Sequence, residues 1–320
     1  MISLLQKTCV ISSFFAIFLL SSCLTDDQMR ERALASPVED ITKYPKVEEY
    51  LDSHKAFISL TTSPKRIKNL IMVLDTLDLT YIEKIFLVLP EQYRNEAGNK
   101  YEVPAEVKNF DKLEILIISY DLGPLSKLVP AVQKIQELYP YDPENIIITI
   151  DDDIAYPKGQ ISGLIKNAIL KDAVVSASGF YVPLFNLRRE DWPQPELSSP
   201  YCYFGAGRCD VVEAYAGIAY KIRHIVELGG TETLMRLSKL GYPEDKNCFL
   251  SDDLVISFAL ARAGVTRWVI SDKFLYSPWP YSLGLGEDAL HKGSGISGSL
   301  NGNFGKYEKC FGYFLSKEMS

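Results

Sequence analysis

The stretch NIIITIDDDIAYP, Asn145–Pro157, decides the fold class because it joins the most continuous apolar run of the chain to three consecutive aspartates. A run that is apolar at nearly every position, rather than at every second one, is typical of a strand covered on both faces. In sheets built from such strands, ligands bind beyond the carboxyl ends of the strands. The stretch therefore predicts a buried central strand that ends at a polar site.

Similar apolar runs alternate with helical patterns on the amino-terminal side of this stretch. Further strands are predicted over 56–60, 84–89 and 113–119, and helices over 66–77 and 129–138. Strands that alternate with helices at this interval favour right-handed βαβ units and a mainly parallel sheet. The predicted fold class is α/β, with helices flanking the sheet and polar strand ends at 61–66, 120–127 and 151–153.

The half of the chain after residue 155 is less regular. Short strands are predicted over 173–178 and 268–270. A helix is predicted over 251–264, with Ser251 as its N-cap and Gly264 at its end. The stretches 181–203 and 282–305 are predicted to be irregular, the second because it holds seven glycines.

Composition excludes several classes of protein. The chain has 320 residues, of which 47% are hydrophobic and 23% charged, and these values exclude a disordered chain, a collagen-like chain and a multi-span membrane protein. The formal net charge of −7 argues against a broad nucleic-acid surface. Six cysteines without a CxxC pair are too few for a disulfide scaffold and argue against a structural zinc site.

The first residues form a targeting pattern. An apolar run over 10–20 follows one basic residue, and Leu-Ser-Ser-Cys occupies 20–23. The pattern predicts a secretory signal, and its end is similar to a bacterial lipobox, in which Cys23 would be lipidated. An uncleaved anchor and a wrongly assigned start codon stay open as alternatives. With a lipidated signal or an anchor, the chain is tethered to a membrane and its folded unit lies on the non-cytoplasmic side.

The aspartate triplet is the strongest chemical signal. On a continuing strand Asp151 and Asp153 would point to one side and Asp152 to the other. Three adjacent carboxylates repel one another, and a divalent cation relieves that repulsion; oxygen ligands select a hard ion, Mg²⁺ or Mn²⁺. The alternative is a solvated acidic turn in which the aspartates cap the following backbone.

Three segments resemble one family in order and spacing. IIITIDDDIAYP (146–157) resembles the D-x-D segment of metal-dependent nucleotide-sugar glycosyltransferases of the GT-A fold, both exostosin-like and family-2-like. ISLTTSPKRI (58–67) is similar to the first strand and loop, which hold the nucleotide in that family. DLGPLSKLVP (121–130) resembles the segment that closes on the nucleotide in exostosin-like members. The resemblance covers about residues 55–271.

The resemblance implies a set of donor-site residues, each with a suitable chemistry. Threonine hydroxyls, an arginine fork and a lysine suit a base, a ribose and a diphosphate. The implied nucleotide-binding residues are Thr61, Thr62, Arg66, Lys127, Asp151 and Asp152. The implied metal ligands are Asp151, Asp153 and His291.

The resemblance also implies an acceptor side. FLSDDLVISFALARAG (249–264) resembles the acidic helix start at which one carboxylate acts as general base, which favours Asp253 over Asp252. The helix dipole would keep such an acid ionised. YAGIAYKI (215–222) is similar to a strand lining the acceptor site, where Gly217 would let a sugar approach. Aromatic residues of the long loop are candidates for sugar stacking: Trp192, Tyr201 and Tyr203.

The implied activity is transfer of a hexosyl or N-acetylhexosaminyl group from a nucleoside-diphosphate sugar, with a UDP-sugar favoured, to a hydroxyl of a glycan, lipid or protein acceptor. Mn²⁺ or Mg²⁺ is the implied cofactor, and both inversion and retention stay open. One alternative is a haloacid-dehalogenase-like phosphatase, whose pattern requires threonine where this chain has Ala155. The other is a non-catalytic, membrane-tethered binding module on a degenerate transferase scaffold, because nucleotide sugars are scarce outside a bacterial cytoplasm.

The domain organisation follows from these patterns. A signal or short anchor is predicted over 1–23 and a linker over 24–54. The folded unit is predicted to begin near Lys55 and to extend to residue 320, with a nucleotide-binding half over 55–155 and an acceptor half over 156–320.

Overall fold

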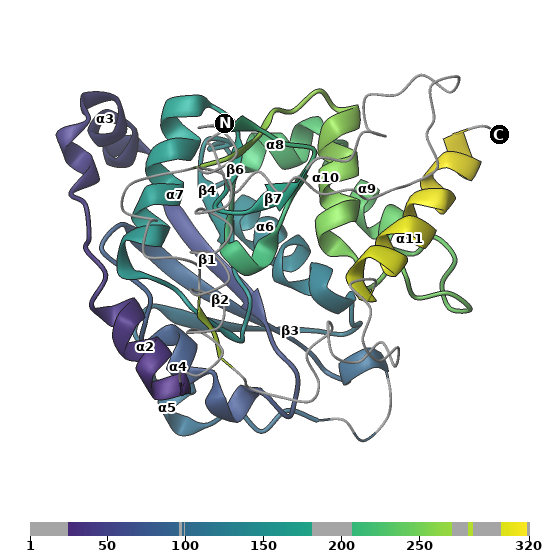
Figure 1. Cartoon of the computed structure of the whole chain (residues 1–320), viewed down its shortest axis with the longest axis horizontal. Coiled ribbons are helices and arrows are strands. Elements are labelled where there is room, and N and C mark those ends of the chain that lie inside the picture. Colours follow the sequence, from purple (N-terminus) through teal and green to yellow (C-terminus); the bar gives the residue numbers. More distant parts are fainter. Residues whose placement is uncertain are drawn as a thin grey trace, which may run out of the picture.

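A computed structural model describes residues 25–95, 98, 100–180, 207–270, 281–283 and 302–318. The described residues form an eight-stranded central sheet with helices on both faces (Figure 1). Its strands, in spatial order, are β3 (Leu113–Ile118), β2 (Ile82–Pro90), β1 (Ala56–Thr61), β4 (Ile146–Thr149), β10 (Ile218–Lys221), β6 (Val174–Ser176), β11 (Arg267–Val269) and β8 (Gly207–Arg208). Two small ladders pair β5 (Ile154–Ala155) with β12 (Tyr281–Ser282) and β7 (Gly179–Phe180) with β9 (Val211–Val212).

The direction of the strands confirms the predicted α/β class with a mainly parallel central sheet. The strands β3, β2, β1 and β4 pair in parallel, and β11 is parallel to β6. Since β10 is antiparallel to both β4 and β6, those two strands share one direction. In the central sheet as described, β10 and β8 therefore run against a mainly parallel array.

The α-helices outside the sheet are α2 (Asp26–Leu34), α3 (Pro45–Ser53), α4 (Ile71–Leu74), α5 (Ala105–Lys108), α6 (Val129–Leu138), α7 (Lys158–Lys171), α8 (Ile222–Glu227), α9 (Gly230–Ser238), α10 (Asp252–Arg262) and α11 (Gly302–Glu318). Short 3₁₀ helices are η1 (Ile41–Lys43), η2 (Ile67–Asn69), η3 (Tyr93–Asn95), η4 (Gly123–Lys127) and η8 (Ala214–Ala216). The strands predicted from apolar runs and the helix predicted over 129–138 are confirmed.

Both faces of the sheet are covered, as the continuous apolar run predicts. Ile147 of β4 belongs to one core with α6, α9, α10 and α11, whereas its neighbours Ile146 and Ile148 belong to another core with α4 and α7. All three isoleucines are fully buried. Because side chains alternate along a strand, successive residues of β4 pack into two different cores. The central strand is therefore buried on both faces of the sheet.

The helix predicted over 66–77 is replaced by the shorter pieces η2 and α4. The Thr76 hydroxyl donates to the carbonyl of Val73 at 2.7 Å and accepts from the backbone N–H of Tyr156 at 3.0 Å. A threonine that hydrogen-bonds its local backbone competes with helix continuation. The helix is therefore shorter than its apolar spacing predicts, because Thr76 makes a contact with a residue distant in sequence.

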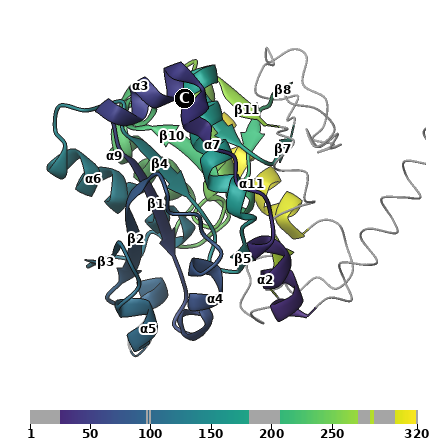
Figure 2. The same ribbon diagram turned by 90° about the vertical axis from the view of Figure 1, so that its left-hand side faces the viewer.

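The predicted linker over 24–54 also requires correction, because its described residues are part of the folded unit. Ala33, Ile41 and Val47 have no exposed surface and join the core beneath α7. Figures 1 and 2 show α3 beside α7 and α2 beside α4. The apolar residues are too widely spaced to give a local pattern, so the docking depends on tertiary contacts. The folded unit therefore includes residues 25–54.

The predicted signal or anchor over 1–23 lies outside the described residues. Across the helices that the structure does describe, none combines the length and the apolar character that a membrane crossing requires.

A buried ion pair connects the amino-terminal segment to α7. Glu39 lies 2.6 Å from the Lys166 ammonium and 2.5 Å from that of Lys43. Burial alone would raise the pKa of Glu39, but hydrogen bonds from Lys166, Lys43 and Tyr44 outweigh it and lower the pKa to about 2. The ionised carboxylate therefore stabilises the docked segment.

The shift at Glu39 predicts a pH dependence of stability. Since its folded-state pKa lies below the unfolded value, Glu39 contributes stability above pH ~4.5 that is lost as the pH falls towards 2. We expect Glu39→Gln to lower the free energy of unfolding at pH 7 by about 2 kcal/mol and by much less at pH 3. Urea unfolding at both pH values measures this difference. Glu49→Gln, at an exposed position of α3, is the control; an equal loss for Glu39→Gln at both pH values would contradict the assignment.

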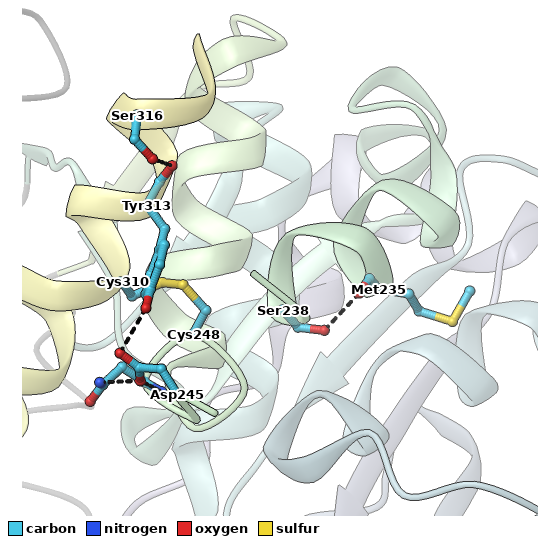
Figure 3. The surroundings of a disulfide bond; sticks show 8 residues. Met235, Ser238, Asp245, Cys248, Cys310, Tyr313 and Ser316 are labelled. Atoms are coloured by element: carbon cyan, nitrogen blue, oxygen red, sulfur yellow. Dashed lines mark hydrogen bonds between the residues drawn. A yellow bond between two sulfur atoms is a disulfide. The ribbon is translucent and has the colours of Figure 1, made fainter. Parts of the chain in front are cut away.

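A disulfide anchors the carboxyl-terminal helix. Cys248, in the loop before α10, is bonded to Cys310 of α11 (Figure 3). The Tyr313 hydroxyl donates to Asp245 at 3.1 Å, and the ring of Phe314 stacks on Phe258 of α10 at 4.2 Å. The predicted irregular stretch over 282–305 is therefore wrong at its end, where α11 begins at residue 302.

Candidate functional site

The acidic turn after β4 meets η4 and the start of α10 around one buried lysine. The Lys127 ammonium lies 2.7 Å from Asp151 and 2.9 Å from Asp252. Burial alone would lower the pKa of Lys127, but the charges of Asp151, Asp252 and Asp253 outweigh it and raise the pKa well above its usual value. Lys127 is 4% exposed and charged, so it joins the two halves of the chain electrostatically.

Gly123 allows η4 to lie close to the loop before α10. Its φ is +63°, and a Cβ atom there would lie 2.9 Å from the backbone oxygen of Phe249. A side chain at this position would therefore push η4, and with it Lys127, away from Asp252.

A second cation holds the other two aspartates. The Arg66 guanidinium lies 2.9 Å from Asp152 and 3.0 Å from Asp153. The predicted alternation, with Asp151 and Asp153 on one side, is wrong, because β4 ends at Thr149 and the triplet lies in a turn. Asp152 and Asp153 therefore share Arg66, while Asp151 faces Lys127.

A tyrosine joins the acidic turn to the second half. The Tyr156 hydroxyl accepts from the backbone N–H of Asp151 at 2.9 Å and donates to the carbonyl of Tyr215 at 3.0 Å. Tyr156 is fully buried. The Tyr156 hydroxyl thus connects the acidic turn to the segment that precedes β10.

The carboxylates at this end of the sheet exceed the cations near them. Among the described residues the acids are Asp151, Asp152, Asp153, Glu213, Asp252 and Asp253, and the cations are Arg66, Lys127 and Lys306. Burial raises the pKa of Asp152 to about 7, with the Asp153 charge adding to the rise and Arg66 opposing it. Carboxyl groups thus outnumber cations at the site, and burial raises the pKa values of Asp152, Glu213 and Asp253, with repulsion between carboxylates adding to the rise at Asp152 and Asp253.

The acidic turn offers suitable donor atoms for a divalent cation. One oxygen of Asp152, Oδ2, is buried with no hydrogen-bond partner in the described residues. Carboxylate oxygens are the ligands preferred by Mg²⁺ and Mn²⁺. No group of three His, Cys, Asp or Glu residues poised to hold a metal occurs in the described ranges, and the predicted ligand His291 lies outside them. The residues present therefore fit part of a coordination shell.

The acidic start of α10 gives its two aspartates different surroundings. Asp252 faces Lys127, whereas Asp253 Oδ1 accepts from the backbone N–H of Ala214 at 3.0 Å. Burial, and then the charge of Asp252, raises the pKa of Asp253 well above its usual value. The expectation that the helix dipole keeps this acid readily ionised is therefore wrong. Ser251 is the N-cap residue, but its side chain makes no capping hydrogen bond.

Glu213 joins the site although no sequence pattern singles it out. It follows β9, and its Oε2 accepts from the Ser178 hydroxyl at 2.6 Å. Burial raises its pKa to about 7, and the hydrogen bond from Ser178 opposes the rise. The sequence offers one indication of its role, because Glu213 lies two residues before the segment 215–222, which resembles a strand lining the acceptor site.

The helix α11 adds residues that the sequence did not indicate either. Lys306 is within electrostatic reach of Asp252 and Asp253, and Tyr307 is within reach of Asp253 and Glu213. Both lie about one helical turn before Cys310, so the disulfide holds them at the acidic site.

Some predicted residues do not face the site. The Thr61 hydroxyl donates to the carbonyl of Val88 at 2.8 Å and is used by the sheet. Thr62, in contrast, does reach the site, where it is buried and hydrogen-bonds Asp152. A Cβ atom on Gly217 would lie 2.9 Å from Leu164, so core packing fills the space expected for a sugar. The predicted stacking residues lie outside the described residues: Trp192, Tyr201 and Tyr203.

Comparison with known proteins gives no family assignment. No family model matches the chain, and no curated protein matches it by sequence. Among solved structures, a 4-diphosphocytidyl-2C-methyl-D-erythritol synthase has a TM-score of 0.39 at 9% identity, with 69% of this chain and 91% of that one covered. A Francisella tularensis 2-C-methyl-D-erythritol 4-phosphate cytidylyltransferase (IspD) has a TM-score of 0.37 at 11% identity, with 69% and 92% covered. A197 from STIV has a TM-score of 0.30 at 13% identity, with 68% and 82% covered.

Proposed function

We propose that this protein is a metal-dependent glycosyltransferase that moves a hexosyl or N-acetylhexosaminyl group from a nucleoside-diphosphate sugar, preferably a UDP-sugar, to an acceptor hydroxyl. The observation that carries the proposal is the acidic turn at the carboxyl end of β4, with its unpartnered Asp152 oxygen and an excess of carboxylates over cations. Carboxylate oxygens at the end of a strand can bind a divalent cation, and the bound cation can bind the diphosphate of the donor.

The donor side consists of the turn and the cations that hold it. Asp151 and Asp153 are the proposed protein ligands of Mn²⁺ or Mg²⁺, with 31% and 15% of their side chains exposed. When bound, the ion supplies positive charge against the developing charge of the departing diphosphate. Arg66 and Lys127 orient these carboxylates, in place of the direct nucleotide contacts expected from the sequence.

An aromatic surface lies beside the donor side. Tyr101 donates its hydroxyl to the carbonyl of Thr62 at 2.8 Å, and its ring meets that of Tyr93 edge to face at 6.4 Å. Tyr93 and Asp152 are both within electrostatic reach of Arg66. These rings are the proposed contacts for the nucleotide base, because bases stack on aromatic side chains.

The acceptor side consists of the start of α10 and the segment around Glu213. Asp252 forms an ion pair with Lys127. Asp253 has a partly accessible side chain and is therefore the proposed contact for an acceptor hydroxyl. The glycan, lipid or protein acceptor is a further part of the proposal.

The disulfide supports a location outside a reducing cytoplasm. Bonds such as Cys248–Cys310 are typical of exported and luminal proteins. We therefore place the folded unit on the non-cytoplasmic side of a membrane, with an amino-terminal lipoprotein signal or anchor as the proposed tether.

Turnover of sugar nucleotides tests the proposed function. With the full chain and Mn²⁺, at least one UDP-sugar of a panel of hexoses and N-acetylhexosamines should release UDP to water, and EDTA should abolish the release. Asp153→Asn should lower the rate at least about 100-fold, whereas Asp111→Asn, at an exposed position, should not change it. Metal-dependent hydrolysis of p-nitrophenyl phosphate without UDP release would indicate a phosphatase instead, and the absence of both activities would favour a binding module.

A further inference from the structure

Glu213 is a half-buried carboxylate, enclosed by protein on most sides, that the donor chemistry does not use. Within the described part of the chain no lysine, arginine or histidine pairs with it. Its Oε2 is held by the Ser178 hydroxyl at 2.6 Å, and the Ser178 oxygen accepts from the Tyr215 hydroxyl at 2.8 Å. A buried acid without a compensating cation is costly for a fold, and such acids occur preferentially at functional sites.

The backbone around Glu213 is firmly positioned. Its N–H donates to the carbonyl of Ser178 at 3.1 Å, and its own carbonyl accepts from the Ser176 hydroxyl at 3.0 Å. The next residue, Ala214, donates to Asp253. The Glu213 carboxylate is therefore fixed beside the acidic start of α10.

The two oxygens of Glu213 differ in their surroundings. Oε2 accepts the hydrogen bond from Ser178, whereas no hydrogen bond to Oε1 is formed within the described residues. The residue keeps accessible surface although it is surrounded by protein. As far as the described residues go, Oε1 is thus the acceptor position that stays open on an otherwise oriented carboxylate.

We propose that Glu213 is a catalytic residue of the acceptor side, which takes the proton of the attacking hydroxyl at Oε1 while Ser178 and Tyr215 position it. This inference depends on the proposed glycosyl transfer. The acceptor O–H bond breaks and its proton passes to Glu213, the acceptor oxygen bonds to the anomeric carbon, and the bond from that carbon to the diphosphate oxygen breaks with its electron pair leaving on the diphosphate. The step is balanced without a further reactant.

The neighbouring acids support this role for Glu213. Adjacent carboxylates disfavour one another's ionisation, and Asp253 is within reach of Glu213, Asp252 and Asp151. Asp253 also uses one oxygen for Ala214, and its pKa is raised well above its usual value. Burial raises the pKa of Glu213 only to about 7, which suits proton transfer near neutral pH.

Replacement of Glu213 by glutamine tests the inference, because glutamine keeps the shape and can still accept from Ser178. With the UDP-sugar and Mn²⁺ that serve the wild type, we expect kcat for UDP release to fall at least about 100-fold while KM changes less than about threefold. Binding of UDP in Mn²⁺, measured by isothermal titration, should be unchanged. Glu232→Gln, at an exposed position of α9, is the matched control and should retain full turnover.

The pH profile separates chemistry from structure. Because a general base must be deprotonated, the wild-type rate should rise with pH through about 7, and Glu213→Gln should lose this rise. Of the residues that the structure describes, the ionisable groups facing Glu213 are Asp253 from α10, Tyr307 from α11 and Tyr215. Since the Ser178 hydrogen bond lowers the pKa of Glu213, Ser178→Ala should shift the rise to higher pH.

The outcomes are distinct. Wild-type turnover and an unchanged pH profile in Glu213→Gln would overturn the inference and leave the proposed function intact. If the glutamine variant does not fold, an unshifted profile in Ser178→Ala overturns the inference and a shifted one supports it. Failure of the wild type to bind UDP or any other nucleoside diphosphate in Mn²⁺ would remove the proposed function itself.

Discussion

Replacing Lys127 by methionine is expected to lower the free energy of unfolding by about 3 kcal/mol or more. Methionine keeps an apolar stem but removes the charge that lies 2.7 Å from Asp151 and 2.9 Å from Asp252. Removing one partner of a buried ion pair leaves an uncompensated charge, and here it leaves two. Urea denaturation followed by circular dichroism at pH 7 measures the loss.

Two variants make this prediction specific. Lys134→Met removes a lysine of α6 that pairs with Glu137 at the surface, and it should change stability by less than about 0.5 kcal/mol. Adding Asp252→Asn to Lys127→Met should restore part of the loss, because one unpaired carboxylate is then neutral. A Lys127→Met protein as stable as the Lys134→Met protein would show that Lys127 does not hold the two halves together.

Replacing Cys310 by serine is expected to lower the free energy of unfolding by about 4 kcal/mol, because the bond closes a loop with a sequence separation of 62. Guanidinium unfolding under non-reducing conditions measures the effect. The wild type in reductant should unfold like the variant, and Cys248→Ser/Cys310→Ser should be no less stable than Cys310→Ser. A wild type that is insensitive to reductant would contradict the predicted contribution of the bond.

The sequence predicts those features that leave a local pattern. The run before Asp151 identifies β4, and the rule that ligands bind at strand ends identifies the turn after it. Apolar spacing identifies α6 to its terminal residues, Val129 and Leu138. These elements are fixed by local periodicity and by burial on both faces of the sheet.

The remainder of the site depends on contacts between distant residues. The pairing of Arg66 with Asp153 spans 87 positions, and that of Glu39 with Lys166 spans 127. Glu213 acquires its surroundings only when β9, α10 and α11 meet. Because no local period marks such contacts, the sequence indicated Arg66 as a ligand contact rather than as a partner of the aspartates, and it indicated 24–54 as a linker.

Isothermal titration of the full chain with UDP, in Mn²⁺ and then in EDTA, tests the central claim most directly. The account predicts binding in Mn²⁺, at least about tenfold weaker binding in EDTA, and loss of the metal-dependent part in Asp153→Asn. Absence of heat with UDP, with other nucleoside diphosphates and with their sugar derivatives, in a folded sample saturated with Mn²⁺, would contradict it.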